Sequence, residues 1–303
     1  MAGLIKSRAV ISVLGLGLAI QSLSAAENLP IWELQNTNNQ LHLMGSIHVL
    51  RAEDYPLPDG IFAAYEQADE LFMEIDMDDI DAAAMQATIM GMSISPDGRQ
   101  LKDILGEQDY NKAVKLADDL DLPMGLTLEM LNSFEPWFVA VTISQLRVEA
   151  LGYDPAWGIE MQLQQRASQD GKTITGLETI EEQFGYLDRL DENAQKLFLM
   201  QALNNETDER AEIEAMIAAW RSGSAEQLAD QITDEFLEVP GLYDALLVQR
   251  NRSWIDTITN LTSSDKNYLV VVGSLHLTGE DSVINMLEDA GFPAKQLTSS
   301  ELN

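Results

Sequence analysis

The chain has 303 residues, of which 46% are hydrophobic, so it can bury a sizeable core and is not of the composition that stays disordered. Its 50 acidic and 18 basic residues give a formal charge of −32, which argues against nucleic acid or an anionic membrane surface as a partner and is typical of a solvated acidic surface. It has no cysteine, which excludes a disulfide framework and a lipid-modified cysteine.

Residues 1–26 have the three parts of a secretory signal peptide. Lys6 and Arg8 precede the apolar stretch 9–20, and small residues follow at 22–26. An uncleaved membrane anchor is the alternative, but the apolar stretch is short for a bilayer span of about 20 residues. We therefore expect cleavage between Ser24 and Glu27 and a periplasmic or secreted protein, with 27–303 as one domain and no stable membrane span after removal of the signal.

Strands and one helix are predicted in the first part of the mature chain. Apolar pieces at 31–34 and 41–44 flank a polar turn, which is the pattern of a hairpin. Asp59 is expected to cap a helix that runs to Ala68, and the apolar run 70–75 follows as a strand. This part of the chain predicts the order strand, strand, helix, strand.

Helical patterns dominate the middle of the chain from 78 to 152, interrupted by prolines. A helix over 158–170 is expected to end at Gly171, and a strand over 172–177 follows it. The middle region therefore repeats the alternation of helix and strand.

Helices dominate again over 179–261, where Asp191, Ser224 and Thr233 are candidate N-caps. The apolar run 268–272 is the clearest buried strand, and a closing helix is expected over 280–290. Because strands are few and widely spaced, the predicted fold class is α/β, with a small central sheet that carries large helical insertions.

One tetrapeptide pattern occurs twice, as Gly45-Ser46-Ile47-His48 and Gly273-Ser274-Leu275-His276. Each copy follows a predicted buried strand, so each histidine stands at a strand's carboxyl end, where open α/β sheets place ligands. His42 lacks the preceding glycine and alternates with leucines, so we interpret it as structural. The pattern predicts one site built from both ends of the chain, and the alternative is two unrelated strand ends.

Glu74 lies within the apolar run that ends at Ile75, where an unpaired charge would be costly. With His48 and His276 it would give a divalent metal such as Mn²⁺, Co²⁺ or Zn²⁺ three protein ligands and an open position for water. Glu74 is thus the candidate third ligand or general base. Asp76 lies on the same strand face and competes for this role, and a solvent-facing position is the alternative for Glu74.

Three further charged residues are candidates for the site. Glu160 opens a predicted helix, where it could instead favour the helix dipole, and Glu178 directly follows a strand, as the histidines do. Arg250 is notable because basic residues are scarce, and its guanidinium could hold a substrate carboxylate or a developing oxyanion. A surface ion pair is the alternative for Arg250.

These motifs together resemble the TraB/GumN family, which includes PrgY-type pheromone inhibitors and is similar to the animal Tiki proteins. The resemblance extends from about residue 29 to residue 292 and is carried by Trp32, Gly45-Ser46-Ile47-His48, Tyr55-Pro56-Leu57-Pro58, Glu74, Trp157-Gly158-Ile159-Glu160, Gly176-Leu177-Glu178-Thr179, Glu182-Gln183, Arg250-Asn251 and Gly273-Ser274-Leu275-His276. The chain lacks the membrane helices of some TraB relatives, which argues against a membrane-bound pheromone-blocking role.

The resemblance implies an EreA/ChaN-like α/β fold and, through the Tiki branch, a divalent-metal-dependent peptidase whose Gly-x-x-His histidines and a glutamate form the site. By motif it implicates the residues His48, Glu74, His276, Glu160, Glu178 and Arg250. The expected function is an exported metal-dependent hydrolase of a peptide or small molecule. Because one related branch binds haem, a non-catalytic protein that binds haem, metal or peptide is the alternative, and a partner-binding protein with a vestigial site is the third.

Overall fold

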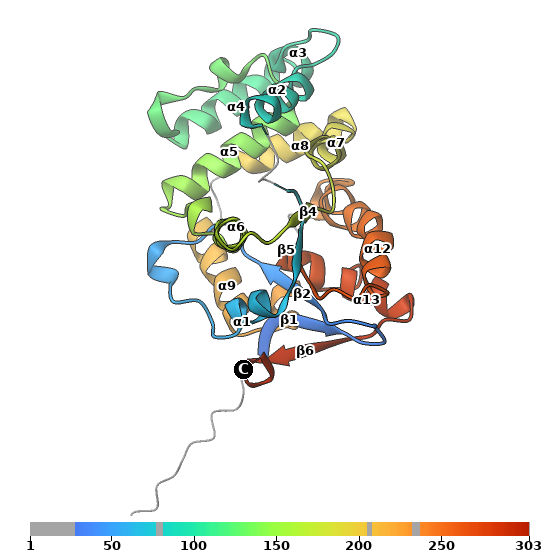
Figure 1. Ribbon diagram of the computed structural model, residues 1–303. Coiled ribbons are helices and arrows are strands. Elements are labelled where there is room, and N and C mark those ends of the chain that lie inside the picture. The colour runs from blue at the N-terminus through green and yellow to red at the C-terminus, as the bar shows by residue number, and fades with distance from the viewer. Residues whose placement is uncertain (1–27, 77–80, 205–207, 232–236, 303) are drawn as a thin grey trace, which may run out of the picture.

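Six strands form one mixed sheet in the computed structural model, which describes residues 28–76, 81–204, 208–231 and 237–302 (Figure 1). Their order across the sheet is β4-β3-β5-β2-β1-β6. The strands are β1 Asn28–Leu34, β2 Leu41–Ser46, β3 Glu70–Met73, β4 Ile174–Gly176, β5 Tyr268–Gly273 and β6 Ala294–Thr298.

The four strands β4, β3, β5 and β2 are parallel, whereas β1 runs antiparallel to both of its neighbours, β2 and β6. The predicted hairpin is β1 and β2, and the predicted strand over 268–272 is β5 in the centre of the sheet. Because parallel strands end at one edge, the segments that follow β2, β3, β4 and β5 are brought together there.

The sheet is buried on both faces between helices (Figure 1). Leu269 and Val271 of β5 belong to the core that includes residues of α1, α6 and α9, whereas Val270 and Val272 belong to the core with α12 and α13. A strand covered on both faces needs an apolar residue at every position, which explains the uninterrupted run that predicted β5.

The helices are α1 Ile61–Gln67, α2 Ala82–Ser93, α3 Leu101–Leu105, α4 Glu107–Asp119, α5 Pro136–Ala150, α6 Ile159–Asp170, α7 Ile180–Asp188, α8 Glu192–Ala202, α9 Glu209–Arg221, α10 Ala225–Ala229, α12 Gln249–Leu261, α13 Val283–Asp289 and α14 Ser299–Leu302. A π-helical turn, η5 Asp244–Val248, leads directly into α12. In the ranges that the structure describes, none of the helices combines the length and apolarity needed to cross a membrane.

A helical region lies beyond the carboxyl ends of the parallel strands (Figure 1). Residues of α3, α4, α5 and α8 form its core. A smaller hydrophobic cluster contains Trp137 of α5, Leu187 of α7 and Ala194 of α8. The predicted fold class, an α/β sheet with large helical insertions, is confirmed.

Several predicted boundaries shift in the structure. Gly60 rather than Asp59 is the N-cap of α1, because its φ of 110° suits glycine. The closing helix begins at Val283 rather than at residue 280, because the Ser282 side chain caps it. Thr179, Asp191 and Ser224 are N-caps, and Thr233 lies outside the described residues.

Candidate functional site

The two Gly-x-x-His segments lie side by side at the carboxyl ends of β2 and β5. Gly45 pairs with Val272 in the parallel register, and the Ser274 hydroxyl donates to the Ser46 carbonyl at 2.7 Å. A Cβ on Gly45 would lie 2.9 Å from Ser274 Oγ, so glycine permits this close approach. The structure therefore brings the two predicted histidine segments into one place.

The beginning of α6 fixes the position of His48. Its Nδ1 lies 2.6 Å from Glu160 Oε1, an oxygen that also accepts from the Ser46 hydroxyl. A Cβ on Gly158 would lie 2.1 Å from the His48 carbonyl oxygen, so only glycine fits there. The motif Trp157-Gly158-Ile159-Glu160 thus packs against the first Gly-x-x-His segment, and Glu160 orients the imidazole.

The Glu160 carboxylate raises the pKa of His48 to about 9 through charge attraction and the hydrogen bond. Because the His48 side chain is 61% exposed, water screens this attraction. The second oxygen of Glu160, Oε2, is buried and has no hydrogen-bond partner in the described structure. It is therefore an acceptor that a substrate or water could use.

His276 is buried and neutral. Asn251 donates its amide N–H to the Asp281 carbonyl at 2.8 Å, so its Oδ1 faces His276 Nδ1 at 2.6 Å and makes that nitrogen the donor. Arg250 can only donate, so His276 Nε2 accepts from it at 3.2 Å. Burial lowers the pKa of His276 to about 3, in agreement with the neutral tautomer that these partners require.

Glu74 directly follows β3 and is buried, as its place in an apolar run predicted. Its Oε1 accepts from the Gly273 backbone N–H at 2.7 Å, and its Oε2 accepts from Arg250 at 2.5 Å. Burial alone would raise the pKa of Glu74, but the positive charge of Arg250 holds that pKa well below its usual range. Glu74 is therefore an anion at neutral pH.

Arg250 lies at the centre of the cluster, on the first turn of α12. It donates to Glu178 Oε1 from Nε at 2.8 Å and from one terminal nitrogen at 2.5 Å. Its side chain is only 8% exposed, so the surface ion pair considered for it is wrong. Burial raises the pKa of Glu178, and the Arg250 guanidinium opposes this rise. The cluster thus holds one guanidinium between two buried carboxylates.

Asp76, the competing candidate, and His42, interpreted as structural, lie apart from the cluster. Asp76 lines a separate cavity of about 710 Å³ between α2 and the segment after β4, so Glu74 and not Asp76 meets the histidines. His42 is buried in β2 opposite Glu33, and burial lowers its pKa. Its placement inside the sheet agrees with the structural interpretation.

Two further side chains, to which the sequence had assigned no role in the site, complete the cluster. Gln183 donates to both Glu74 and Glu178, at 3.3 and 3.1 Å. The Trp254 indole donates to Glu178 Oε2 at 3.3 Å and packs on the His276 ring at 4.6 Å. Trp254 lies four residues after Arg250, so the helical period of α12 would have placed it on the same face.

The cluster forms one end of a cavity of about 410 Å³ between the sheet and the helical region. His48, Glu74, Glu160 and Arg250 line this end. The rest of the lining is mainly apolar, and most of it comes from α5, α6, α7 and η5. A cavity with a few converging polar groups and an apolar wall is the usual form of a small-molecule or peptide site.

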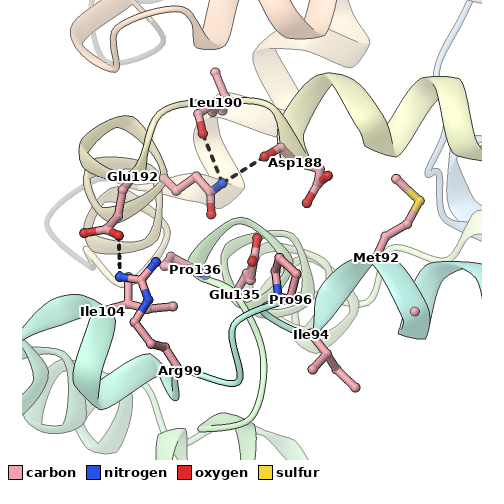
Figure 2. A pocket seen from close by; sticks show the side chains of 12 residues that line it. Met92, Ile94, Pro96, Arg99, Ile104, Glu135, Pro136, Asp188, Leu190 and Glu192 are labelled. Carbon is pink, nitrogen blue, oxygen red and sulfur yellow. Dashed lines mark hydrogen bonds and ion pairs between the residues drawn. The ribbon is translucent and has the colours of Figure 1, made fainter.

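A second cavity, of about 440 Å³, lies within the helical region and contains none of the predicted site residues (Figure 2). Glu135 and Asp188 point into it. Burial raises the pKa of both carboxyls, and the charge of Asp188 adds to the rise at Glu135. The buried Trp137 Nε1 lies near both carboxyls but forms a hydrogen bond with neither of them.

The imidazole nitrogens and the carboxylate near Gly273 are of the chemical types that bind a divalent metal. A Cβ on Gly273 would lie 3.0 Å from His48 Nε2 and 3.3 Å from Glu74 Oε1, so both point to one place, and each histidine has an oxygen on its Nδ1, as metal-bound histidines do. As the side chains lie, no group of three or more His, Cys, Asp or Glu in the described residues is arranged to hold an ion. The Arg250 guanidinium instead contacts Glu74 and His276.

Comparisons with known proteins agree with the motifs. The model of the TraB/PrgY/gumN family matches residues 30–296. The chain is 26% identical over 250 residues to the uncharacterized protein YbaP of Escherichia coli (strain K12), an alignment that covers 82% of this chain and 88% of YbaP. It is 21% identical over 285 residues to an uncharacterized protein of Treponema pallidum (strain Nichols), covering 89% of this chain and 83% of that protein.

Proposed function

The chain belongs to the TraB/PrgY/gumN family, and from the cluster at the ends of β2, β3 and β5 we propose that it is an exported, divalent-metal-dependent hydrolase of peptide bonds. The observation that carries this proposal is the paired orientation of the histidines. Glu160 holds His48 by Nδ1, and Asn251 holds His276 by Nδ1, which leaves both Nε2 atoms on the side of Glu74. Such outer partners are typical of catalytic metal centres.

In this proposal His48, His276 and Glu74 hold the ion, of the Mn²⁺, Co²⁺ or Zn²⁺ type. When bound, the ion supplies Lewis acidity that polarises the substrate carbonyl and water. For all three to bind it, Arg250 has to release His276 Nε2 and Glu74 Oε2, which it contacts at 3.2 and 2.5 Å. Glu178, which accepts two Arg250 hydrogen bonds, is placed to keep the guanidinium after that release.

Glu160 is the best placed general base. The other two carboxylates of the cluster have both oxygens engaged, since Glu74 accepts from Gly273 and Arg250, and Glu178 accepts from Arg250 and Trp254. Glu160 Oε2 alone among these oxygens is unpartnered, and the Glu160 residue lines the cavity. It can accept a proton from an attacking water and return it to the leaving amine.

The charges of the cluster favour an uncharged substrate bond. With the ion bound and His48 neutral as its ligand, the divalent ion and Arg250 together balance the three carboxylates, and the whole chain carries a formal charge of −32. A phosphate or other strongly anionic group would find no uncompensated cation there. A neutral amide does not need one, which is why we propose a peptide rather than a phosphoester.

Export is part of the proposal and is supported by the signal-like residues before Glu27. Residues 1–27 lie outside the described part of the structure. Expression of the full chain in a Gram-negative host followed by periplasmic extraction tests it. We expect a mature protein whose intact mass corresponds to a start between residues 25 and 27, and a full-length chain in the membrane fraction would contradict export.

The test of the activity is cleavage of a mixed peptide pool, followed by mass spectrometry. We expect cleavage after addition of Mn²⁺, Co²⁺ or Zn²⁺, loss of cleavage with EDTA, and recovery when the ion is restored. Loss of a general base costs about 10²- to 10⁴-fold in rate, so Glu160→Gln should fall by at least the lower figure. Glu107→Gln, an exposed carboxylate on α4, is the matched control and should keep full activity.

Two results would contradict the hydrolase. The first is absence of cleavage with all three metals. The second is equal activity in the parent, in Glu160→Gln and in His48→Ala, which would show that the proposed site does not carry out the cleavage. A Soret band after addition of haem, lost in His48→Ala, would favour the non-catalytic haem-binding alternative.

A further inference from the structure

The apolar wall of the site cavity is built from four separate elements. It consists of Val141 from α5, Met161 from α6, Phe184 and Leu187 from α7, and Leu246 from η5. Segments far apart in the sequence therefore converge on the cavity that the charged cluster also lines. We call these five residues the apolar wall.

The apolar wall has no counter-charge for a substrate. The charged residues that line the cavity are His48, Glu74, Glu160 and Arg250, and each is already paired within the cluster. The remaining polar lining residues, Gln164 and Gln183, are uncharged amides. A charged substrate side chain laid against this wall would lose its water without gaining an ion pair, which is costly.

The wall is firmly supported on one side and open on the other. Leu187 is buried, and the Phe184 ring packs on Trp137 with ring centres 5.9 Å apart. Met161, by contrast, is 43% exposed although it is a large apolar residue, and it follows Glu160 directly in the chain. An exposed methionine beside a candidate base is well placed to contact whatever enters, because its side chain adapts to different shapes.

We infer that the apolar wall is the side-chain subsite of the enzyme and selects peptides with a bulky apolar residue, of the size of Leu, Met or Phe, next to the bond that is cut. This inference rests on the proposed function for the position of that bond. The cavity of about 410 Å³ accommodates such a residue with its flanking backbone. Met161 and Phe184 are then specificity-determining residues.

Binding of four labelled peptides tests the inference. The peptides share one short uncharged frame and differ only in a central Phe, Ala, Asp or Lys, and fluorescence anisotropy is measured on Glu160→Gln so that they stay intact. We expect the Phe peptide to bind at least about tenfold more tightly than the Ala peptide, and the Asp peptide to bind most weakly.

Substitutions in the apolar wall should change this order. Met161→Asp places a carboxylate in the wall, so the Phe preference should fall to within about threefold and the Lys peptide should gain. Met130→Asp is the matched control, because Met130 is also an exposed methionine, at 66%, and lies outside this cavity. Phe184→Ala removes apolar surface from the wall without adding charge. It should weaken binding of the Phe peptide more than binding of the Ala peptide.

The outcomes separate the inference from the proposed function. Equal affinities, no binding at all, or a preference for Asp would overturn the inference. Cleavage by the parent without preference for a residue at a fixed position would also overturn it while leaving the hydrolase intact. Selective binding without any cleavage by the parent would support the subsite and contradict the hydrolase.

Discussion

Gly273 lies where His48, Glu74 and His276 converge, and its missing side chain keeps that space open. A Cβ there would be 3.0 Å from His48 Nε2, 3.3 Å from Glu74 Oε1 and 3.5 Å from the His276 ring. Its φ of −51° and ψ of 138° suit any residue, so glycine is required by space and not by backbone conformation. The second glycine of the paired motif therefore has a role in the site.

We predict that Gly273→Ala abolishes metal binding while the fold is kept. The methyl group would occupy the space between the donors, whereas the exposed His48 ring can move aside without disturbing the core. The free energy of unfolding should change by less than about 1 kcal/mol. Calorimetric titration with Mn²⁺ and thermal unfolding measure the two effects.

The control for this substitution is Gly91→Ala on α2, where a Cβ would have no neighbour within 4 Å. Alanine there should leave metal binding unchanged and stabilise the helix slightly. Tight metal binding by Gly273→Ala would show that the ion is held elsewhere.

Arg250→Met should strongly destabilise the protein in the absence of metal. Its removal leaves Glu74 and Glu178 buried without their cation, which costs about 3–5 kcal/mol for such groups. The lowered pKa of Glu74 contributes stability that is fully present above pH 4.5 and is lost as pH falls further. Urea unfolding should therefore show the largest gap between variant and parent near pH 7 and a smaller gap below pH 4.5.

A constant gap across this pH range would contradict the assignment of Arg250 as the cation that stabilises Glu74. Lys102→Met is the control, because it removes an exposed cation on α3 that forms no part of the cluster. It should change stability little at any pH. Partial recovery in Arg250→Met with Glu178→Gln would confirm that the two residues are coupled.

Individual site residues differed in how far the sequence revealed them. The histidines and Glu74 were predictable because each breaks a pattern, a glycine turn after a strand or a carboxylate within an apolar run. Asn251 and Gln183 were not assigned roles because an amide on a helix breaks no pattern. Their hydrogen bonds depend on how α7 and α12 pack, which a single sequence does not reveal.

At the scale of elements, the carboxyl end of α7 and the beginning of α5 meet around the second cavity. Asp188 ends α7, where the helix dipole disfavours a negative charge, and burial raises its pKa. A raised carboxyl pKa contributes stability that is present below pH 3.8 and is lost as pH rises through the folded-state value. Ionised Asp188 therefore costs stability at neutral pH.

Asp188→Asn should stabilise the protein at pH 7. The amide removes the unfavourable charge, and because Asp188 is partly exposed, water screens the effect and the gain stays below about 1 kcal/mol. The gain should shrink as pH falls toward 3.8. Thermal unfolding across this pH range measures it, and a loss of stability at pH 7 would show that Asp188 is held as a favourable anion.

Glu192→Gln is the matched control for Asp188→Asn, since Glu192 lines the same cavity but its pKa is lowered by Lys196 and Arg99. Neutralising it removes favourable contacts and should slightly destabilise the protein at pH 7. The two substitutions at this cavity are therefore expected to change the stability at pH 7 in opposite directions.

Strands that are recognisable from their own apolar and turn residues were predicted. A strand that depends on pairing with a segment far away in the sequence was not. β5 was evident from its continuous apolar run, and the β1 and β2 hairpin from its polar turn. The strand β6, with the sequence AKQLT, was missed because it is only partly buried at the sheet edge and has no apolar run. Its strand character comes from pairing with β1.

At the scale of the whole molecule, the candidate site lies at the boundary between two parts of the fold. The segments that follow the parallel strands supply the histidines, Glu74 and Glu178, whereas α12 and α6 supply Arg250 and Glu160. The helical region supplies most of the apolar wall. The few, widely spaced strand patterns in the sequence predicted this division into a small sheet with large helical insertions. The packing of the helical region over the strand ends could not be predicted, since it depends on contacts between distant segments.

Elemental analysis of the purified mature chain is the most direct test of the central claim that His48, Glu74 and His276 form one metal site. It should be made on the parent and on His48→Ala, His276→Ala and His42→Ala, after incubation with Mn²⁺, Co²⁺ or Zn²⁺ and removal of free ion. We expect about one ion per chain in the parent and in His42→Ala, and loss of the ion in the other two variants. No uptake by the parent, or equal retention in all three variants, would contradict it.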